Sequence, residues 1–157
     1  MPNASDDYRF VINQIADAVL ACRGHVIAMA NERAAALLGT RVDRLEGQPA
    51  LAPFTAASQP IVRARLDGMD RPHDPSRLDV QVQTPEGVRD VELTTAWLPA
   101  ERLTHLALRD VTDARRLREN EERLRLAFAG AQEGVWDWDL ETGAVRYSDR
   151  WKAMLGY

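Results

Sequence analysis

The segment between Leu78 and Val111 restricts the fold more than any other part of this chain, because its apolar side chains recur at every second position. That period places alternate side chains on opposite faces of an extended chain, so it predicts strands. Turn residues divide the segment at Pro85-Glu86-Gly87 and after Pro99. Short turns join neighbouring strands in antiparallel pairs, and the segment therefore predicts a three-stranded meander. One face of the first strand holds Leu78, Val80 and Val82, and one face of the second holds Val91, Leu93, Thr95 and Trp97. Residues 103–111 give the third strand.

The residues before the meander predict helices and a hairpin. Apolar residues from Tyr8 to Ile15 recur at helical spacing. Two apolar runs, 18–22 and 25–30, flank Arg23-Gly24 and predict two strands joined by a tight turn. Asn31 and Gly39 are typical of the start and end of a short helix, and weaker signals predict helices at 42–45 and 60–69. With the meander, the hairpin completes a five-stranded antiparallel sheet with helices on one face, which is an α+β fold.

Composition narrows the class of protein. The chain has 157 residues, of which 45% are hydrophobic and 28% charged, and this balance is typical of a soluble globular domain. A net charge of -4 argues against nucleic acid as a partner, since phosphate binding needs a concentrated basic surface. One cysteine, no secretory signal and no long apolar run predict a cytoplasmic protein without direct membrane insertion.

Residues 113–131 differ from the rest, because they are rich in Arg and Glu and lack Pro. Their apolar positions alternate at steps of three and four, which predicts a helix with a heptad stripe interrupted by Glu121. We expect this helix to form a homodimer through Leu117, Leu124 and Phe128. The alternative is a charged helix whose apolar stripe lies on its own domain.

The sequence also repeats itself. Residues 133–136 resemble residues 17–20 at an offset of 116, and residues 154–156 match residues 37–39 at an offset of 117. The second copy predicts a hairpin through Trp136 and Tyr147 and a helix capped by Ser148. We therefore expect a complete domain over 1–112, a linker helix over 113–131 and the N-terminal fragment of a second domain over 132–157.

Four segments resemble the PAS domain family. Asn31 to Gly39 resembles its Asn-x-x-x-x-x-hydrophobic-Leu-Gly segment, and 45–49 resembles the Gly-x-Pro stretch that follows. Residues 109–115 are similar to the Asp-Ile-Thr-Glu-Arg signature at the end of a PAS domain. Residues 134–140 with 148–157 resemble the start of a second PAS domain. The chain thus resembles the tandem PAS sensor region of a bacterial signal-transduction protein.

The resemblance implies a mechanism. A small ligand, cofactor or partner would act at a pocket between sheet and helices, whose binding residues stay unidentified. The change would pass through Asp110, Val111 and Thr112 into the dimeric helix and on to an output domain downstream of Tyr157. One alternative is a ligand-free dimerisation or spacer element. Another is the N-terminal regulatory part of a sensor histidine kinase or of a cyclic-dinucleotide cyclase or phosphodiesterase.

Catalytic and cofactor chemistry finds little support in the residues. We expect no enzyme activity, because no nucleophile, base or paired carboxylates form a motif. His25, His73 and His105 lack the spacing of metal ligands, so we expect no metal. The resemblance leaves haem at His73 and flavin beside Trp97 open, although a loop histidine and a core tryptophan are the simpler interpretations. Cys22 lies outside the Asn-Cys-Arg motif of flavin photosensors and is expected in the core.

Overall fold

The computed structural model describes residues 4–68, 77–130 and 136–156. The chain divides into two compact units, Met1–Thr112 and Asp113–Tyr157. Each unit has its own sheet.

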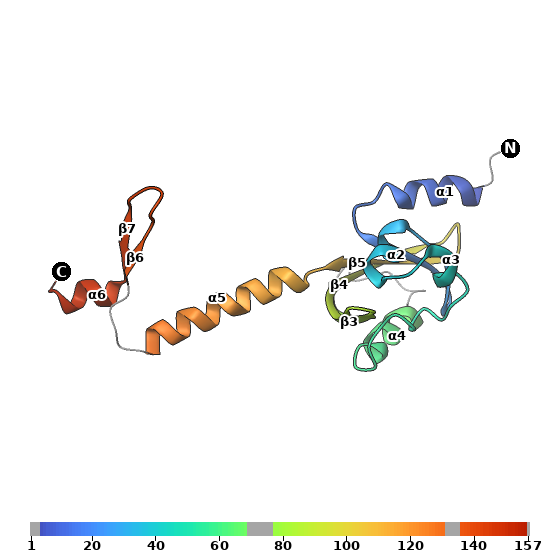
Figure 1. The fold of residues 1–157 in the computed structure, drawn as a ribbon. Coiled ribbons are helices and arrows are strands. Elements are labelled where there is room, and N and C mark those ends of the chain that lie inside the picture. Colours follow the sequence, from blue (N-terminus) through green and yellow to red (C-terminus); the bar gives the residue numbers. More distant parts are fainter. Residues whose placement is uncertain (1–3, 69–76, 131–135, 157) are drawn as a thin grey trace. The chain divides into compact units, whose positions relative to one another are not determined.

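The first unit contains the predicted five-stranded antiparallel sheet (Figure 1). Its strands are β1 (Ala18–Arg23), β2 (Val26–Ala30), β3 (Leu78–Thr84), β4 (Gly87–Leu98) and β5 (Leu103–Asp110). They lie in the order β2-β1-β5-β4-β3. The last strand of this unit in sequence is therefore its central strand in space, and it pairs with β1 as far as Leu108 and with β4 as far as Asp110.

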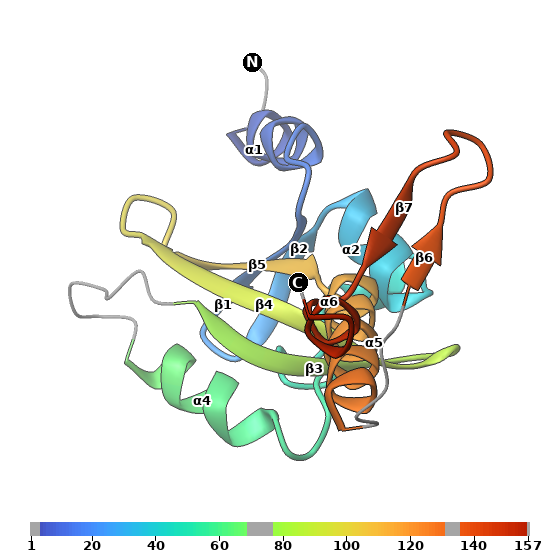
Figure 2. The same ribbon diagram turned by 90° about the vertical axis from the view of Figure 1, so that its left-hand side faces the viewer.

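Three helices cover one face of this sheet (Figure 2). They are α2 (Glu32–Leu38), α3 (Val42–Leu45) and α4 (Gln59–Asp67), close to the predicted ranges. Alternate residues of each strand, such as Leu106 and Leu108 in β5, join residues of these helices in one buried apolar cluster. Burial of apolar surface is the main favourable term in folding, so this cluster is the principal core of the unit.

The first helix, α1 (Ala4–Asn13), contacts the other face of the sheet. The Tyr8 ring lies 5.4 Å from the ring of His105, which projects from β5 on the side opposite to Leu106. Ile12 is 1% exposed. The prediction of helices on one face holds for α2, α3 and α4, and α1 adds cover on the opposite face because Tyr8 and Ile12 need apolar surface of their own.

Asn31 joins α1, β1 and α2 at one buried point. Its Oδ1 accepts hydrogen bonds from the N–H groups of Ala34 and Val19, both at 2.9 Å. Its Nδ2 donates to the carbonyl oxygens of Ile12 at 2.9 Å and Asp17 at 3.0 Å. The sequence predicts the cap on Ala34, whereas the other three bonds depend on the tertiary structure.

The second unit holds α5 (Thr112–Gly130), β6 (Trp136–Trp138), β7 (Val145–Tyr147) and α6 (Asp149–Met154). The predicted hairpin and capped helix are present. Trp136 pairs with Tyr147, which repeats the pairing of Leu20 with Ala30 at offsets of 116 and 117. Ser148 accepts a hydrogen bond from the N–H of Trp151, as Asn31 does at the start of α2. The repeat therefore extends from sequence to backbone pairing.

Candidate coupling site at the end of β5

Thr112 begins α5 and is 1% exposed. Its Oγ1 accepts a hydrogen bond from the N–H of Asp90 at 2.9 Å, and its hydroxyl lies 2.6 Å from Oδ1 of Asp110, to which it can donate. The same Oδ1 accepts from the N–H of Thr112 at 2.9 Å. The N–H of Val111 donates to the carbonyl oxygen of Asp90, also at 2.9 Å. All three predicted coupling residues are thus joined to each other or to Asp90 on β4.

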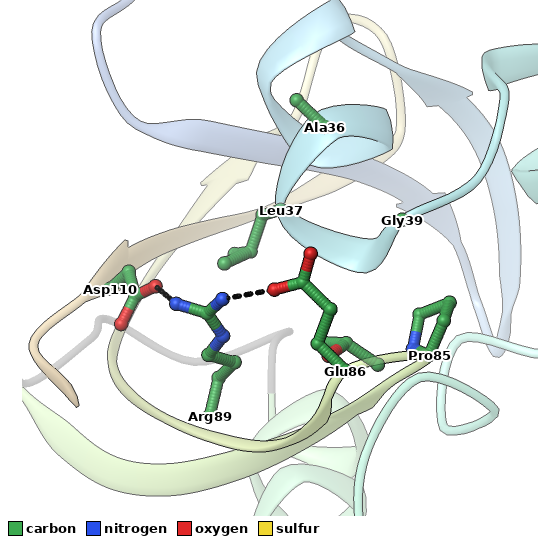
Figure 3. A pocket seen from close by; sticks show the side chains of 8 residues that line it. Ala36, Leu37, Gly39, Pro85, Glu86, Arg89 and Asp110 are labelled. Carbon is green, nitrogen blue, oxygen red and sulfur yellow. Dashed lines mark hydrogen bonds and ion pairs between the residues drawn. The ribbon is translucent and has the colours of Figure 1, made fainter.

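Arg89 extends this network to the turn between β3 and β4 (Figure 3). Its Nη1 lies 3.3 Å from Oδ2 of Asp110, and its Nη2 lies 2.6 Å from Oε2 of Glu86. The Glu86 side chain is 77% exposed, so solvent screens that ion pair. These contacts orient the carboxylate of Asp110 more than they stabilise the fold.

Arg109 fastens the end of β5 on the opposite side. Its Nε and Nη2 both lie 3.1 Å from the carboxylate oxygens of Asp17, which precedes β1. The hydrogen bond and charge of Asp17 raise the pKa of the Arg109 guanidinium above its ordinary value, although the group is exposed. Asp17, just before β1, and Arg89 on β4 therefore hold the last two residues of β5.

A cleft of about 380 Å³ opens beside Asp110. The end of α2 forms one wall with Ala36, Leu37 and Gly39, and the turn after β3 forms the other (Figure 3). These walls approach closely, because a Cβ atom on Gly39 would lie 2.6 Å from Cδ of Pro85. Any movement of the turn relative to α2 therefore changes the surroundings of Asp110.

Asp110 and Thr112 make different contacts at the start of α5. In the structure Asp110 supplies the acceptor for the N–H of Thr112, and the Thr112 hydroxyl reaches Asp90. Sequence reasoning missed Asp90 and Arg89, because their approach to the start of α5 follows from the pairing of Val91 with Asp110 across β4 and β5.

The predicted dimer residues lie on α5. Leu117 is 61% exposed and Leu124 is 54% exposed. The side chain of Phe128 lies outside the described residues. The two leucines are thus available to a partner.

The cysteine, histidine and tryptophan residues considered for metal or cofactor binding have ordinary surroundings where the structure describes them. Cys22 is buried, and that burial raises the pKa of its thiol to about 12, so it is unsuited to act as a thiolate. His25 lies on the surface, 2.8 Å from the carboxylate of Asp67, and His73 lies outside the described residues. Trp97 is 37% exposed at the end of β4. Within the described residues no group of three His, Cys, Asp or Glu side chains could hold a metal ion, and no described helix has the length and apolar character to cross a bilayer.

Thr95 places a buried hydroxyl on the helix-covered face of β4. It pairs with Leu106 on β5 and lies between Leu93 and Trp97 on the same face of β4. Its Oγ1 is buried and has no hydrogen-bond partner among the described residues. A buried hydroxyl without a partner is unfavourable, and a bound polar group would satisfy it.

Comparisons with known proteins agree with this architecture. A family model described as a PAS domain matches residues 7–71. A segment of 39 residues is 46% identical to part of hybrid signal transduction histidine kinase A from Dictyostelium discoideum. That segment covers 25% of this chain and 2% of the relative.

Solved structures share the fold at low sequence identity. The PAS domain of an HTR-like protein from Haloarcula marismortui has a TM-score of 0.57 and 16% identity, over 70% of this chain and 99% of that one. The PAS domain of the quorum-sensing receptor RpfR from Cronobacter turicensis, in complex with BDSF, has a TM-score of 0.55 and 17% identity. That match covers 62% of this chain and 96% of the receptor domain.

Proposed function

Since the unit that ends at Thr112 is a PAS domain, we propose that it is a regulatory module, without a reaction of its own, that senses a small ligand or a partner and passes its state to α5. The network of Asp90, Asp110 and Thr112 carries this proposal. It connects the backbone of β4 to the first residue of α5.

The relay works through strand position. The backbone of Asp90 accepts a hydrogen bond from Val111 and donates one to Thr112, so a shift of β4 along β5 lengthens both bonds together. Each such bond contributes about 1 kcal/mol net, and a buried N–H left without a partner costs about 1–3 kcal/mol. A change of this size is enough to alter the population of two helix states by about ten-fold or more.

The coupling test replaces one hydroxyl. Thr112→Val keeps the shape of the side chain but leaves the Asp90 N–H without its acceptor, and Thr112→Ser keeps the hydroxyl as the matched control. We expect faster hydrogen exchange in the first turn of α5 for the valine variant and near-normal exchange for the serine variant. Exchange that is unchanged in both variants, with the sheet intact, would show that the network does not hold α5.

For the sensing step, the proposed ligand site is the interior of the domain beside Thr95. Its unsatisfied hydroxyl supports this site, and the complex of the Cronobacter PAS domain with BDSF supplies a probe. Native mass spectrometry of the purified chain should show a retained compound, or BDSF should raise its thermal midpoint. Thr95→Val should weaken that response. No retained compound and no stabilisation by any tested ligand would instead favour the ligand-free spacer.

The proposal extends to the protein class of the whole chain and to the second unit. The identity to a histidine kinase segment supports a parent protein of the signal-transduction class, with an output domain downstream and a dimer formed through α5. The repeated pairing of Trp136 with Tyr147 supports β6, β7 and α6 as the start of a second PAS domain. Translation of the codons after Tyr157 tests both statements, because a second sheet and a catalytic or output domain should follow.

A further inference from the structure

One side-chain pair joins the junction between α1 and β1 to the end of β5. The Nε and Nη2 atoms of Arg109 lie 3.1 Å from Oδ1 and Oδ2 of Asp17. Two parallel bonds between a guanidinium and a carboxylate fix the orientation of both groups as well as their distance. The two residues are 92 positions apart in the sequence, so the pair connects distant parts of the first unit.

The strand pairing gives this contact its importance. β1 pairs with β5 only as far as Leu108, so Arg109 lies beyond that ladder. On the other side, β4 pairs with β5 as far as Asp110. The last two residues of β5 thus have a strand on the β4 side, and on the β1 side the carboxylate of Asp17 holds Arg109.

Asp17 is fixed in turn to the end of α1. Nδ2 of Asn31 donates to the carbonyl oxygen of Ile12, in the last turn of α1, at 2.9 Å and to that of Asp17 at 3.0 Å. The Ile12 carbonyl oxygen also accepts from the N–H of Ile15 at 3.3 Å, which continues the turn toward Asp17. Ile12 is 1% exposed. A movement of this buried end of α1 therefore carries Asp17 with it.

We propose that α1 is a second input to the coupling site and that the contact between Asp17 and Arg109 carries it, an inference that rests on the proposed role of α5 as the output helix. Arg109 immediately precedes Asp110, whose Oδ1 accepts from the N–H of Thr112 at 2.9 Å. When α1 moves, Asp17 draws Arg109 with it, and the carboxylate of Asp110 changes its distance from Thr112. Chains of hydrogen bonds and packed side chains can carry such coupling between sites.

This route is separate from the relay through β4. Asp90 holds Thr112 from the β4 side, whereas Asp17 acts on β5 from the β1 side. The coupling site therefore responds to two quantities, the position of β4 along β5 and the position of α1, whichever contact sets each of them.

The surroundings of the pair leave room for this movement. A cleft of about 330 Å³ lies beside it, and Ala16 and Leu37 form part of its lining with Asp17 and Arg109. The Arg109 side chain is 56% exposed and that of Asp17 is 30% exposed. Water and salt screen exposed ion pairs, which therefore contribute little to stability. The pair can open while the unit stays folded, as a relay contact requires.

Amide hydrogen exchange at Thr112, measured by NMR in the full chain, tests the contact. Arg109→Gln removes the charge and both bonds, and the Thr112 N–H should exchange roughly two- to five-fold faster. Arg109→Lys keeps the charge without the two parallel bonds, so its effect should be intermediate. Arg33 lines the same cleft but takes no part in the bonds between α1 and Arg109, which makes Arg33→Gln the matched control with an unchanged rate.

A double-mutant cycle tests the input from α1. Ile12→Ala loosens the buried end of α1 and should speed exchange at Thr112 when Arg109 is present. In the Arg109→Gln background the same change should have little further effect, because the connecting contact is gone. Val62→Ala in α4 removes a side chain that is 0% exposed, and its effect should be equal in both backgrounds. Ile12→Val takes the place of Ile12→Ala if the alanine variant does not fold.

Three outcomes decide between the routes. Equal effects of Ile12→Ala with and without Arg109 would overturn our proposal, as would a wild-type rate at Thr112 in Arg109→Gln. If Thr112→Val still speeds exchange in the first turn of α5, only the second input is wrong and the relay through β4 remains. If neither Arg109→Gln nor Thr112→Val changes exchange, the relay to α5 is wrong as well.

Discussion

Replacing Asn31 with alanine should destabilise the first unit far more than the loss of an ordinary helix cap. The side chain is fully buried and forms four hydrogen bonds of 2.9–3.0 Å to three different elements. At about 1 kcal/mol for each bond, we expect a loss of about 4 kcal/mol. A domain of this size has about 5–15 kcal/mol of stability, so this loss is a large part of the total.

Asn31→Ser divides the effect into two parts. Serine can keep the cap on Ala34, a contact of about 1 kcal/mol, but it cannot reach the carbonyl oxygens of Ile12 and Asp17. We expect it to cost about 2–3 kcal/mol, which also leaves a folded protein to measure if the alanine variant does not fold.

Urea denaturation followed by circular dichroism measures both variants. The urea concentration at the unfolding midpoint should be highest for the wild type, lower for the serine variant and lowest for the alanine variant. The slope of the free energy of unfolding against urea should not change. Hydrogen exchange should rise first in α1, because one of the lost bonds holds Ile12 near its end and another holds Asp17 in the chain that follows it. An alanine variant that loses only about 1 kcal/mol would show that the three tertiary bonds contribute nothing, and would refute the reasoning.

Two further predictions concern the same unit. Gly39→Ala should cost about 2–3 kcal/mol, because a left-handed backbone at φ 63 and a contact of 2.6 Å with Pro85 both oppose a Cβ atom. Gly24→Ala, at φ 58 with open space around it, is the matched control and should cost only about 1 kcal/mol in the same urea experiment; equal losses would contradict the steric argument. Burial lowers the pKa of His105 below 6.5, so it is neutral in both the folded and unfolded chain above that pH. As pH falls below 6.5, the unfolded chain binds the proton first and the free energy of unfolding decreases. Between pH 7.5 and 5.5 the thermal midpoint should therefore fall more in the wild type than in His105→Gln. An equal fall in the two proteins would contradict this.

Local pattern was sufficient where one side chain or one short segment decides the structure. The alternation in β3 and β4, with the turns that bound β4, predicted the meander, because a half-buried strand must alternate its side chains. The capping positions of α2 followed from Asn31 and Gly39 for a similar reason, since each satisfies backbone geometry within its own turn. The offset of 116 also predicted the second hairpin, in which Trp136 pairs with Tyr147.

What the sequence by itself determined is therefore the set of elements and their order, and it singled out Asp110 and Thr112 as candidate coupling residues. Tertiary structure decided which residues those two touch. Asp90 and Arg89 carry no motif, and only the antiparallel register of β4 and β5 brings them to the start of α5. It also decided that α1 lies against His105 and that Asn31 binds three elements at once. The physical reason is that hydrogen bonds between distant residues depend on how whole strands and helices pack, which local periodicity does not encode.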